Sequence, residues 1–556
     1  MAKIYQTPGV YIEERSAFPN SAVPVATAVP AFIGYTEKAI RDKKPLTLKP
    51  TKISSYGEYL MFFGGPSTTK LTVAASTQEG VPYNLSITES YFTLHSQMKM
   101  FFSNGGTDCY IVSVGGYIKT AKDGKESPNT VEMAVLQTGI EPLLKEMEPT
   151  MLLIPELTTI PLTRDDNGDA TDDDVKELYT LNAEVLNHCG VVMRNRFAIM
   201  DVWMDREKYQ NDSYNMERDI NLFREGVNSP VLAWGATYFP WLHTTAVTAS
   251  EVNVLNVFNL GAATEVVDYD PATQFNEKGE ILKRDEFKTT FLKTEVTSLT
   301  TLLEKSLNQD VFDGNVKMKQ AIKIKPLLKE IAAVTEANVT ELTQSLLAVS
   351  PMFKSLMKDL RKELNLLPPS ASMAGIYSMV DDNVGVFQSP ANIGVGSVIK
   401  PAVNISSDQQ EDLNIPIGGK AVNAIRSFPG KGVLVWGART LDGNSQDWRY
   451  ISVRRTVIYI EQSIKYAAEP YVFEPNTSST WSNMKALLVN FLTNVWQSGA
   501  LAGATAEDAF SVDVGLGSTM TPVDILDGYM RISVKIAVTR PAEFIVITFE
   551  QKMQQS

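Results

Sequence analysis

Residues 151–203 read MLLIPELTTIPLTRDDNGDATDDDVKELYTLNAEVLNHCGVVMRNRFAIMDVW. This stretch opens with an apolar run at 151–155 and closes with another at 196–203, and a helix is predicted between them from about Asp173 to Cys189. A further apolar run, VLAWGATY, follows at 231–238. Apolar strands separated by helices are typical of a parallel sheet covered by helices, so we predict an α/β body.

The composition and periodicity of the sequence change after residue 243 and again after residue 366. Residues 244–366 are rich in Leu, Lys, Glu and Thr, with leucines at helical spacing, so we expect an inserted helical module that ends at Pro368–Pro369. From 370 on, turns and short strands dominate, with helices predicted at 455–468 and 481–496. The prediction is a multidomain α+β and α/β chain with an arm at 1–20, an α/β body at 21–243 and 367–430, a helical insert at 244–366 and a C-terminal α+β domain at 431–556.

Composition excludes several classes of protein. The 556 residues carry a net charge of −13, 44% are hydrophobic, and there are only two cysteines and three histidines. These values exclude a disordered chain, a disulfide framework and a multi-histidine zinc site, and the acidic balance argues against binding nucleic acid. Because no apolar stretch of about 18 residues occurs and the start does not resemble a signal peptide, we expect neither membrane insertion nor export by the general secretory route.

No motif in the sequence forms a catalytic constellation. The nearest match to a phosphate-binding loop, at 414–420, lacks the first glycine and the hydroxyl that would bind magnesium. The acidic run at 165–174 has part of a calcium-loop spacing, but Thr163 occupies the first ligand position, and the alternative is a solvated loop leading into a helix. His188 and Cys189 are adjacent, but no third group can be assigned to orient them. We therefore expect no enzyme activity, no cofactor and no metal.

Both ends of the chain carry strand-forming residues. At the N-terminus, a Thr-Pro-Gly turn at 7–9 separates short strand-forming segments, and the proline-rich stretch at 19–34 predicts an extended linker. At the C-terminus, two segments alternate apolar with polar or small residues, which predicts a β-hairpin or two successive strands. The residues concerned are Ile4, Tyr5, Val10, Tyr11 and Ile12 in the arm, and Ile532, Val534, Ile536, Ile545, Ile547 and Phe549 at the C-terminus. Because a lone strand needs a partner sheet, these ends are suited to strand exchange between identical subunits.

A series of blocks along the chain carries a family resemblance. They are TPGVYIEE at 7–14, VATAVPAFIGYT at 25–36, SSYGEYLMFFGG at 54–65, FFSNGGTDCYIVSV at 101–114, YFPWL at 238–242, PPSASMAGIYSMVDDNVGVFQSPAN at 368–392, GVLVWGARTLDGNSQDWRYISVRRTVIYIEQSI at 432–464 and GYMRISVKIAVTRPAEFIVITFEQ at 528–551. Together they resemble contractile tail sheath proteins, which form the sheaths of contractile phage tails and phage-tail-like injection systems. The block at 432–464 is the most specific, and together the blocks touch most parts of the chain except 244–366.

The resemblance implies a structural subunit that forms stacked hexameric rings around an inner tube and contracts to drive the tube through a target envelope. Its implied partners are further copies of itself, the tube protein, and baseplate and terminal cap proteins, with no nucleic acid and no membrane insertion. The N-terminal arm and the C-terminal segment would complete a β-sheet in a neighbouring subunit. Assembly would take place in the bacterial cytoplasm, and the subunit would be part of a virion or a released particle.

The resemblance also suggests what two regions do. The C-terminal domain would be the inner part of the sheath, and Arg454, Arg455, Glu461 and Lys465 on its first helix are candidates for facing the tube. Alternatively, the two arginines pair within the fold. The insert at 244–366 departs from the family pattern and is expected on the outer surface.

Two other functions stay open at the level of sequence. One is a structural or tube-associated protein that does not contract. The other is an α/β hydrolase, which would need a clustered polar site with a perturbed residue, although the sequence offers no recognisable Ser-His-Asp set.

Overall fold

The computed structural model describes residues 24–76, 80–87, 91–120, 124–165, 168–210, 213–261, 280–281, 284–285, 287, 295–316 and 318–546. Two compact units make up the chain. The larger one, here called the body, comprises residues 28–383 and 390–451. The smaller one, here called the C-terminal unit, contains residues 384–389 and everything from 452 on, and the chain up to Thr27 belongs to it.

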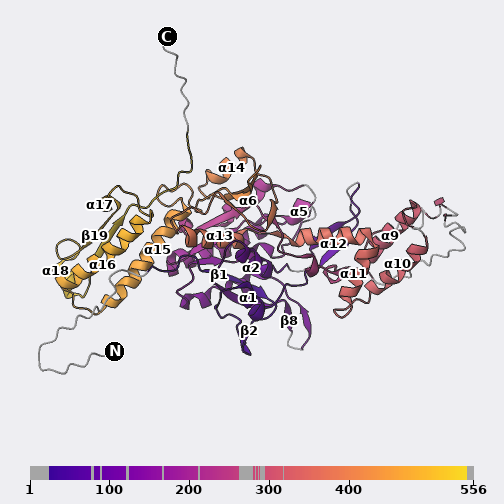
Figure 1. The fold of residues 1–556 in the computed structure, drawn as a ribbon, viewed down its shortest axis with the longest axis horizontal. Coiled ribbons are helices and arrows are strands. Elements are labelled where there is room, and N and C mark those ends of the chain that lie inside the picture. Colours follow the sequence, from indigo (N-terminus) through magenta and orange to yellow (C-terminus); the bar gives the residue numbers. More distant parts are fainter. Residues whose placement is uncertain are drawn as a thin grey trace, which may run out of the picture. The chain divides into compact units, whose positions relative to one another are not determined.

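A nine-stranded sheet forms the centre of the body, in the order β15-β18-β17-β12-β11-β10-β1-β7-β4 (Figure 1). The six strands from β17 to β7 are parallel. The edge strands β15 and β4, and β18 next to β15, pair antiparallel with their neighbours. The strands are β1 (Pro30–Thr36), β4 (Thr51–Ile53), β7 (Cys109–Gly116), β10 (Met151–Leu153), β11 (Phe197–Asp201), β12 (Gly235–Phe239), β15 (Ile393–Gly394), β17 (Asn423–Phe428) and β18 (Gly432–Val435). The predicted α/β class is confirmed.

Helices cover both faces of this sheet. On one face, α4 (Asp172–Asn187) and α6 (Met216–Gly226) pack on a core that includes Val112, Leu152 and Ala198. On the other face, α1 (Tyr56–Phe63), α2 (Leu94–Ser103) and α13 (Ser370–Asn383) share a second core. The strand–helix–strand unit that the sequence predicts at 151–203 is therefore β10–α4–β11.

Several local predictions differ from the structure. The proline-rich stretch at 19–34 was expected to be a linker, but its last part begins β1, an interior strand whose residues 31–33 are fully buried. Pro30 fits there because it is the first residue of the strand. The helix predicted to end at about Cys189 continues as a π-helix to Met193, and the strand expected from Val231 begins at Gly235 after a 3-10 turn.

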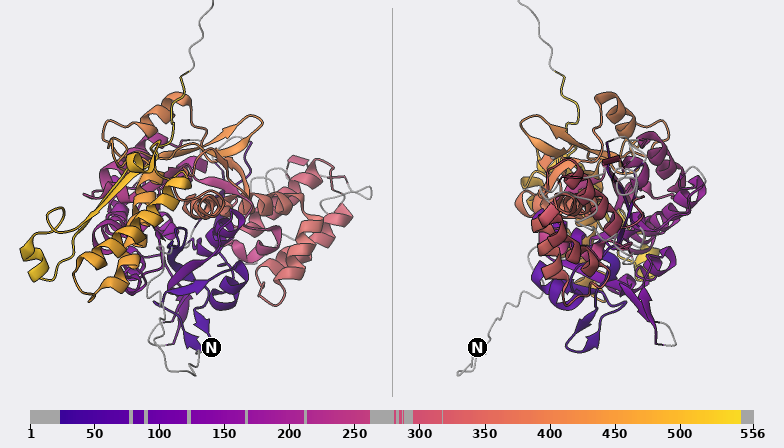
Figure 2. Two further views of the ribbon diagram at one scale, coloured as in Figure 1. Left: turned by 60° about the vertical axis from the view of Figure 1, so that its left-hand side comes forward. Right: turned by 90° about the vertical axis from the view of Figure 1, so that its right-hand side faces the viewer.

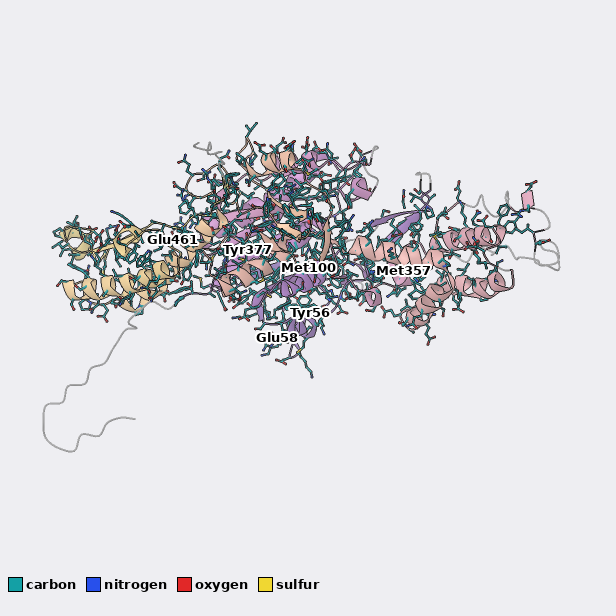
Figure 3. All side chains as sticks on the ribbon, turned by 45° about the horizontal axis from the view of Figure 1, so that its top comes forward. Tyr56, Glu58, Met100, Met357, Tyr377 and Glu461 are labelled. Carbon is teal, nitrogen blue, oxygen red and sulfur yellow. The ribbon has the colours of Figure 1, made fainter. Side chains whose placement is uncertain are left out.

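In the described part of the leucine-rich region, four helices between 299 and 364 share one hydrophobic core (Figure 1). They are α9 (Leu299–Phe312), α10 (Met318–Ile331), α11 (Val339–Val349) and α12 (Pro351–Leu364). The same core includes residues of β5 (Leu71–Ala74) and β6 (Asn84–Ile87), and it joins Met100 of α2 to Met357 of α12, both labelled in Figure 3. The helices therefore pack on chain segments from well before residue 244.

The C-terminal unit contains α15 (Ile451–Ala468), α16 (Ser478–Gln497), α17 (Ala506–Ala509), β19 (Phe510–Val514), α18 (Pro522–Leu526) and β20 (Ile532–Ile536), drawn in orange to yellow in Figure 2. The boundary expected at 431 lies at Ile451 in the structure, because β18 pairs with β17 in the body sheet. Helix α15 begins at Ile451, four residues before the predicted start.

Shorter elements complete the body. They are β2 (Ile40–Arg41), β3 (Lys44–Pro45), β8 (Ile118–Thr120), β9 (Glu126–Pro128), α3 (Met133–Gln137), α5 (Arg206–Gln210), β13 (Leu242–Thr244), β14 (Leu366–Leu367), β16 (Val398–Pro401) and α14 (Ser407–Asn414). Over the described residues, none of the helices combines the length and apolarity needed to cross a bilayer.

Candidate assembly interface

Helix α16 and the β19–β20 pair form the core of the C-terminal unit. Apolar residues of α16 recur three or four positions apart and are buried, among them Met484, Leu488, Phe491 and Val495. In β20, Ile532, Val534 and Ile536 pack against the same core, as their alternation predicts. The sheet therefore has one apolar face, which the helix covers.

The outer edges of this small sheet are open. Strands β19 and β20 pair antiparallel from Phe510–Ile536 to Val514–Ile532, and within the described residues no third strand joins them. The amide of Ala537 donates to the carbonyl of Ala509 at 2.9 Å. Since hydrogen-bonded pairs alternate along an antiparallel ladder, the N–H groups of Val512 and Val534 are directed away from the partner strand. Both edges can therefore accept another strand.

The chain beyond β20 leaves its own core. Leu501 forms a β-bridge with Val538, and Thr539 donates to the carbonyl of Ala500 at 3.1 Å. After that, residues 541–546 belong to no strand, and Phe544, Ile545 and Val546 are 67%, 79% and 88% exposed. In the described part of the chain β20 pairs with β19 and not with residues 541–546, and the choice between a hairpin and two successive strands for the second apolar segment stays a prediction. Ile547 and Phe549 lie outside the described residues.

The N-terminal segment meets the C-terminal unit just before β1. The amide of Val25 donates to the Ser463 hydroxyl at 3.4 Å, and the Arg455 guanidinium donates to the Thr27 carbonyl at 2.8 Å. The arm residues Ile4, Tyr5, Val10, Tyr11 and Ile12 lie outside the described residues. Among the described residues, Val25 and Thr27, which precede β1, therefore contact helix α15.

The four charged residues proposed to face a tube divide into two pairs. Arg454 and Arg455 are 6% and 4% exposed. The Arg454 guanidinium forms a salt bridge with Glu461 of the same helix at 3.4 Å. Burial lowers the pKa of Arg454. Glu461, labelled in Figure 3, and Lys465 are exposed one helical turn apart on α15. The geometry thus favours the alternative reading for the two arginines and leaves the other two side chains on the surface.

Comparisons with known proteins agree on one fold. Residues 444–552 match the family described as the phage tail sheath C-terminal domain. The chain is similar to the PVC sheath of an extracellular contractile injection system in the contracted state, with 22% identity, a TM-score of 0.54 and 99% of both chains covered. The chain has the fold of a contractile sheath protein. The helical sheath of the anti-feeding prophage (AFP), also contracted, is 24% identical with a TM-score of 0.54, over 99% of this chain and 100% of that one.

A curated sheath protein matches part of the sequence. The tail sheath protein of Vibrio phage KVP40 is 23% identical over 184 residues, which is 33% of this chain. The match covers 26% of that relative, so the chain aligns with about a quarter of its length. The resemblance to contractile tail sheath proteins is confirmed.

The three histidines and two cysteines of the chain are buried in its interior. His95, His188 and His243 contact Tyr56, Arg196 and Tyr209, respectively. Burial is the main cause that lowers the pKa of each histidine to about 4. Cys109 and Cys189 are fully buried, which raises the pKa of both thiols. Neutral imidazoles and protonated thiols in separate contacts suit packing, and none of the five is paired as nucleophile and base.

In the described part of the acidic run at 165–174, which has part of a calcium-loop spacing, the carboxylates bind other groups of the protein. The Asp165 carboxylate accepts from the amide of Asp169 at 2.8 Å, and Asp169 pairs with Lys208 at 3.0 Å. Asp172 pairs with Arg218 at 2.7 Å. Among the described residues, no group of three or more His, Cys, Asp or Glu converges as metal ligands would.

A cavity of about 530 Å³ opens where β10 and β11 end in the body. Thr158, Thr159, Arg164, Arg206 and Glu207 supply most of its polar lining. Arg164 pairs with Asp205 at 3.0 Å and with Glu207 at 3.2 Å, so the charges of the lining are largely matched. The residues around the cavity include no histidine, cysteine or serine. The hydroxyls of Thr158 and Thr159 donate to the backbone carbonyls of Pro155 and Glu156, and the Glu207 carboxylate pairs with Arg164, so these groups are not arranged as nucleophile and base.

Proposed function

We propose that this chain is the structural subunit of a contractile sheath that surrounds an inner tube. The observation that carries the proposal is the β19–β20 sheet, which no third strand joins among the described residues. The exposed apolar residues Phe544, Ile545 and Val546 follow it in the chain. The sheath fold across 99% of the chain and the tail sheath match at 444–552 support it. The subunit would not be an enzyme.

Strand exchange would link the subunits. The arm bearing Ile4, Tyr5, Val10, Tyr11 and Ile12, and the segment from Phe544 on, would add strands to the β19–β20 edges of neighbouring copies. An arm that reaches a neighbour makes a head-to-tail contact, which generates rings or helical assemblies such as stacked hexamers. Main-chain hydrogen bonds would persist as tethers while the bodies rotate between an extended and a contracted state.

The inner tube, the baseplate and a terminal cap would be the other partners. Glu461 and Lys465 are exposed on α15 and are the candidates for weak, salt-screened contacts with the tube. Arg454 and Arg455, which are buried, would stabilise the unit that presents them. Support for the baseplate comes from the likeness to an AFP baseplate chain, which is 24% identical with a TM-score of 0.53. Assembly would take place in the bacterial cytoplasm.

Deleting residues 1–20 tests the proposal. We expect a folded subunit with wild-type thermal unfolding that no longer sediments as polymer, because described residues from 28 on already form the cores of the body and of the C-terminal unit. A matched variant keeps the arm's length and replaces its five named strand-forming residues, at positions 4, 5, 10, 11 and 12, with serine; it should fail in the same way. Polymer of normal length from either variant would refute strand exchange by the arm.

Contraction is tested separately by electron microscopy of the wild-type assembly. A contractile sheath predicts a long, narrow form and a short, wide one from the same preparation. A single length and diameter under all conditions would favour the non-contractile alternative.

A further inference from the structure

The outer face of helix α12 is a row of cations. Lys354, Lys358 and Lys362 are exposed and spaced four residues apart, so they lie about 6 Å apart along the helix. Within the described part of the chain, none of the three has a salt-bridge partner. The acidic residues of the same helix are directed elsewhere, since Asp359 accepts from the Tyr83 hydroxyl at 2.6 Å and Glu363 lies 3.7 Å from Arg206. We call these three residues the lysine row.

A groove of complementary charge lies between α6 and α14 of the body. It has a volume of about 420 Å³ and a floor of Met216, Ile220 and Leu413, which are 8%, 2% and 1% exposed. The carboxylates on its rim are Glu217, Asp408 and Asp412. We call this the acidic groove.

The acidic groove is held in place by the fold. Arg224 on α6 donates to the Asp412 carboxylate at 2.8 Å and to the Asp412 carbonyl at 2.7 Å, which fixes α14 beside α6. Ser406 caps α14 through the amide of Gln409 at 3.2 Å. Asp412 is thereby neutralised in part, whereas Glu217 and Asp408 are exposed and, among the described residues, have no salt-bridge partner.

The two surfaces match in spacing and in chemistry. Asp408 and Asp412 are four residues apart on α14, the same interval as the lysines on α12, so two helices lying along each other can bring two pairs together at once. Lysine stems can lie on the apolar floor while their ammonium groups reach the carboxylates on the rim. A chain with a net charge of −13 repels its own copies, and a local cationic surface reduces that repulsion at a contact between copies.

We propose that the lysine row of one copy docks in the acidic groove of a second copy. This inference rests on the proposed sheath function, and it assigns the helical module a role in contacts between subunits. Because the pairs are exposed, each contributes little alone, and the contact is weakened by salt. The groove and the row lie on different elements, so the contact is head-to-tail and can be repeated along an assembly.

Charge reversal on the full chain tests the contact. The row variant is Lys354→Glu, Lys358→Glu and Lys362→Glu, and the groove variant is Glu217→Lys, Asp408→Lys and Glu411→Lys, where Glu411 is the exposed neighbour on α14. Each alone should raise the critical concentration for polymer about tenfold at low salt, and the combined variant should restore it. The readout is sedimented polymer across a salt series.

Matched controls separate the contact from net charge. Lys43, Lys119 and Lys431 are exposed lysines outside the row, and their reversal to Glu changes the net charge by the same amount. This control should polymerise nearly as the wild type does. The row variant combined with Glu126→Lys, Glu141→Lys and Glu184→Lys keeps the native net charge but should stay defective. The proposal is overturned if row and groove variants polymerise like the wild type, or if this mismatched combination rescues as well as the combined variant.

A cross-linking assay tests the contact independently of polymer formation. If the wild type forms no polymer, that result counts against the proposed function and not against the contact. Lys358→Cys and Asp408→Cys chains are mixed and treated with a short bis-maleimide. We expect a mixed dimer well above the amount formed when Lys43→Cys replaces Lys358→Cys. Cys109 and Cys189 are fully buried and do not compete. Equal amounts of dimer in both mixtures would overturn the proposed contact. The contact would also be overturned if the row variant polymerised like the wild type and lost only its binding to anionic lipid vesicles or anionic polymers.

Discussion

Glu156 shows how a single buried carboxylate joins two parts of the body. It is fully buried, and its oxygens accept from the backbone amides of Tyr35 at 2.7 Å, Thr93 at 2.9 Å and Leu94 at 3.0 Å. It thereby links β1 to the first turn of α2. Burial raises its pKa to about 7, although the three amides oppose the shift.

Glu156→Gln should lower the free energy of unfolding by about 1–3 kcal/mol, because an amide nitrogen cannot accept from a backbone N–H. The variant should also change the pH dependence. The folded pKa lies above the usual 4.5, so the stabilisation due to protonation is complete below pH 4.5 and is lost as the pH rises through about 7. The variant should lack this component, which urea unfolding at pH 5, 6, 7 and 8 measures. An unchanged slope, with the exposed Glu141→Gln as control, would contradict the assignment.

The sequence predicts the direction of a side chain within its own strand or helix, but not which other elements pack over that side chain. The alternation of Ile532, Val534 and Ile536 was sufficient to predict one packed face of a strand, because side-chain direction in a strand follows position alone. It could not place Arg454 and Arg455, since a charged residue on a helix is exposed or buried according to what packs over it. The residues of the acidic groove were missed for the same reason, because α6 and α14 are far apart in sequence.

At the scale of elements, the contact between α2 and α13 depends on a glycine. A Cβ on Gly375 would lie 2.4 Å from the carbonyl oxygen of Phe101 and 3.0 Å from the Cβ of Asn104. The backbone atom cannot move without displacing α2, so a side chain at 375 forces the helices apart.

Gly375→Ala should therefore lower the free energy of unfolding by about 1–3 kcal/mol, the usual cost of overpacking a core. Gly418→Ala is the matched control, because nothing lies within 4 Å of a Cβ there. Thermal unfolding of the two variants should differ by several degrees. If both unfold at the same temperature, α2 and α13 do not pack as described.

The elements that sequence predicts well are those whose periodicity matches their burial. The helical character of the leucine-rich module and the strand–helix–strand unit at 151–203 belong to this group, whereas the division of 299–364 into four helices was not predicted. Strand β1 was missed because prolines at 19, 24 and 30 suggested a linker, whereas Pro30 only begins the strand. The partner of β20 was also missed, since β19 at 510–514 pairs with it across a connection that contains α18.

For the whole molecule, two sets of buried groups balance each other as the pH falls. Glu156, Asp201 and Asp219 have pKa values raised to about 7, chiefly by burial, and the three histidines have values lowered to about 4. Between pH 7 and 5 the folded chain takes up protons on the carboxyls, and the unfolded chain takes up a similar number on the histidines.

We therefore expect the free energy of unfolding to change by no more than about 1 kcal/mol between pH 7 and 5, because its slope depends on the difference in bound protons. Denaturant unfolding of the unassembled chain at half-unit steps of pH measures it. In a variant without the three histidines, the free energy of unfolding should rise as the pH falls from 7 to 5, because only the proton uptake by the buried carboxyls of the folded chain remains. A steep loss of stability in the wild type toward pH 5 would contradict the assignment of the carboxyls.

The central claim is that the chain ends complete sheets in neighbouring copies, and a cryo-EM helical reconstruction of the assembled protein tests it most directly. We predict that the outer edges of β19 and β20 each pair with a segment from another copy, one from the N-terminal arm and one from the residues after 543. A reconstruction in which both ends fold back on their own copy, or in which these edges stay unpaired within the polymer, would contradict the account.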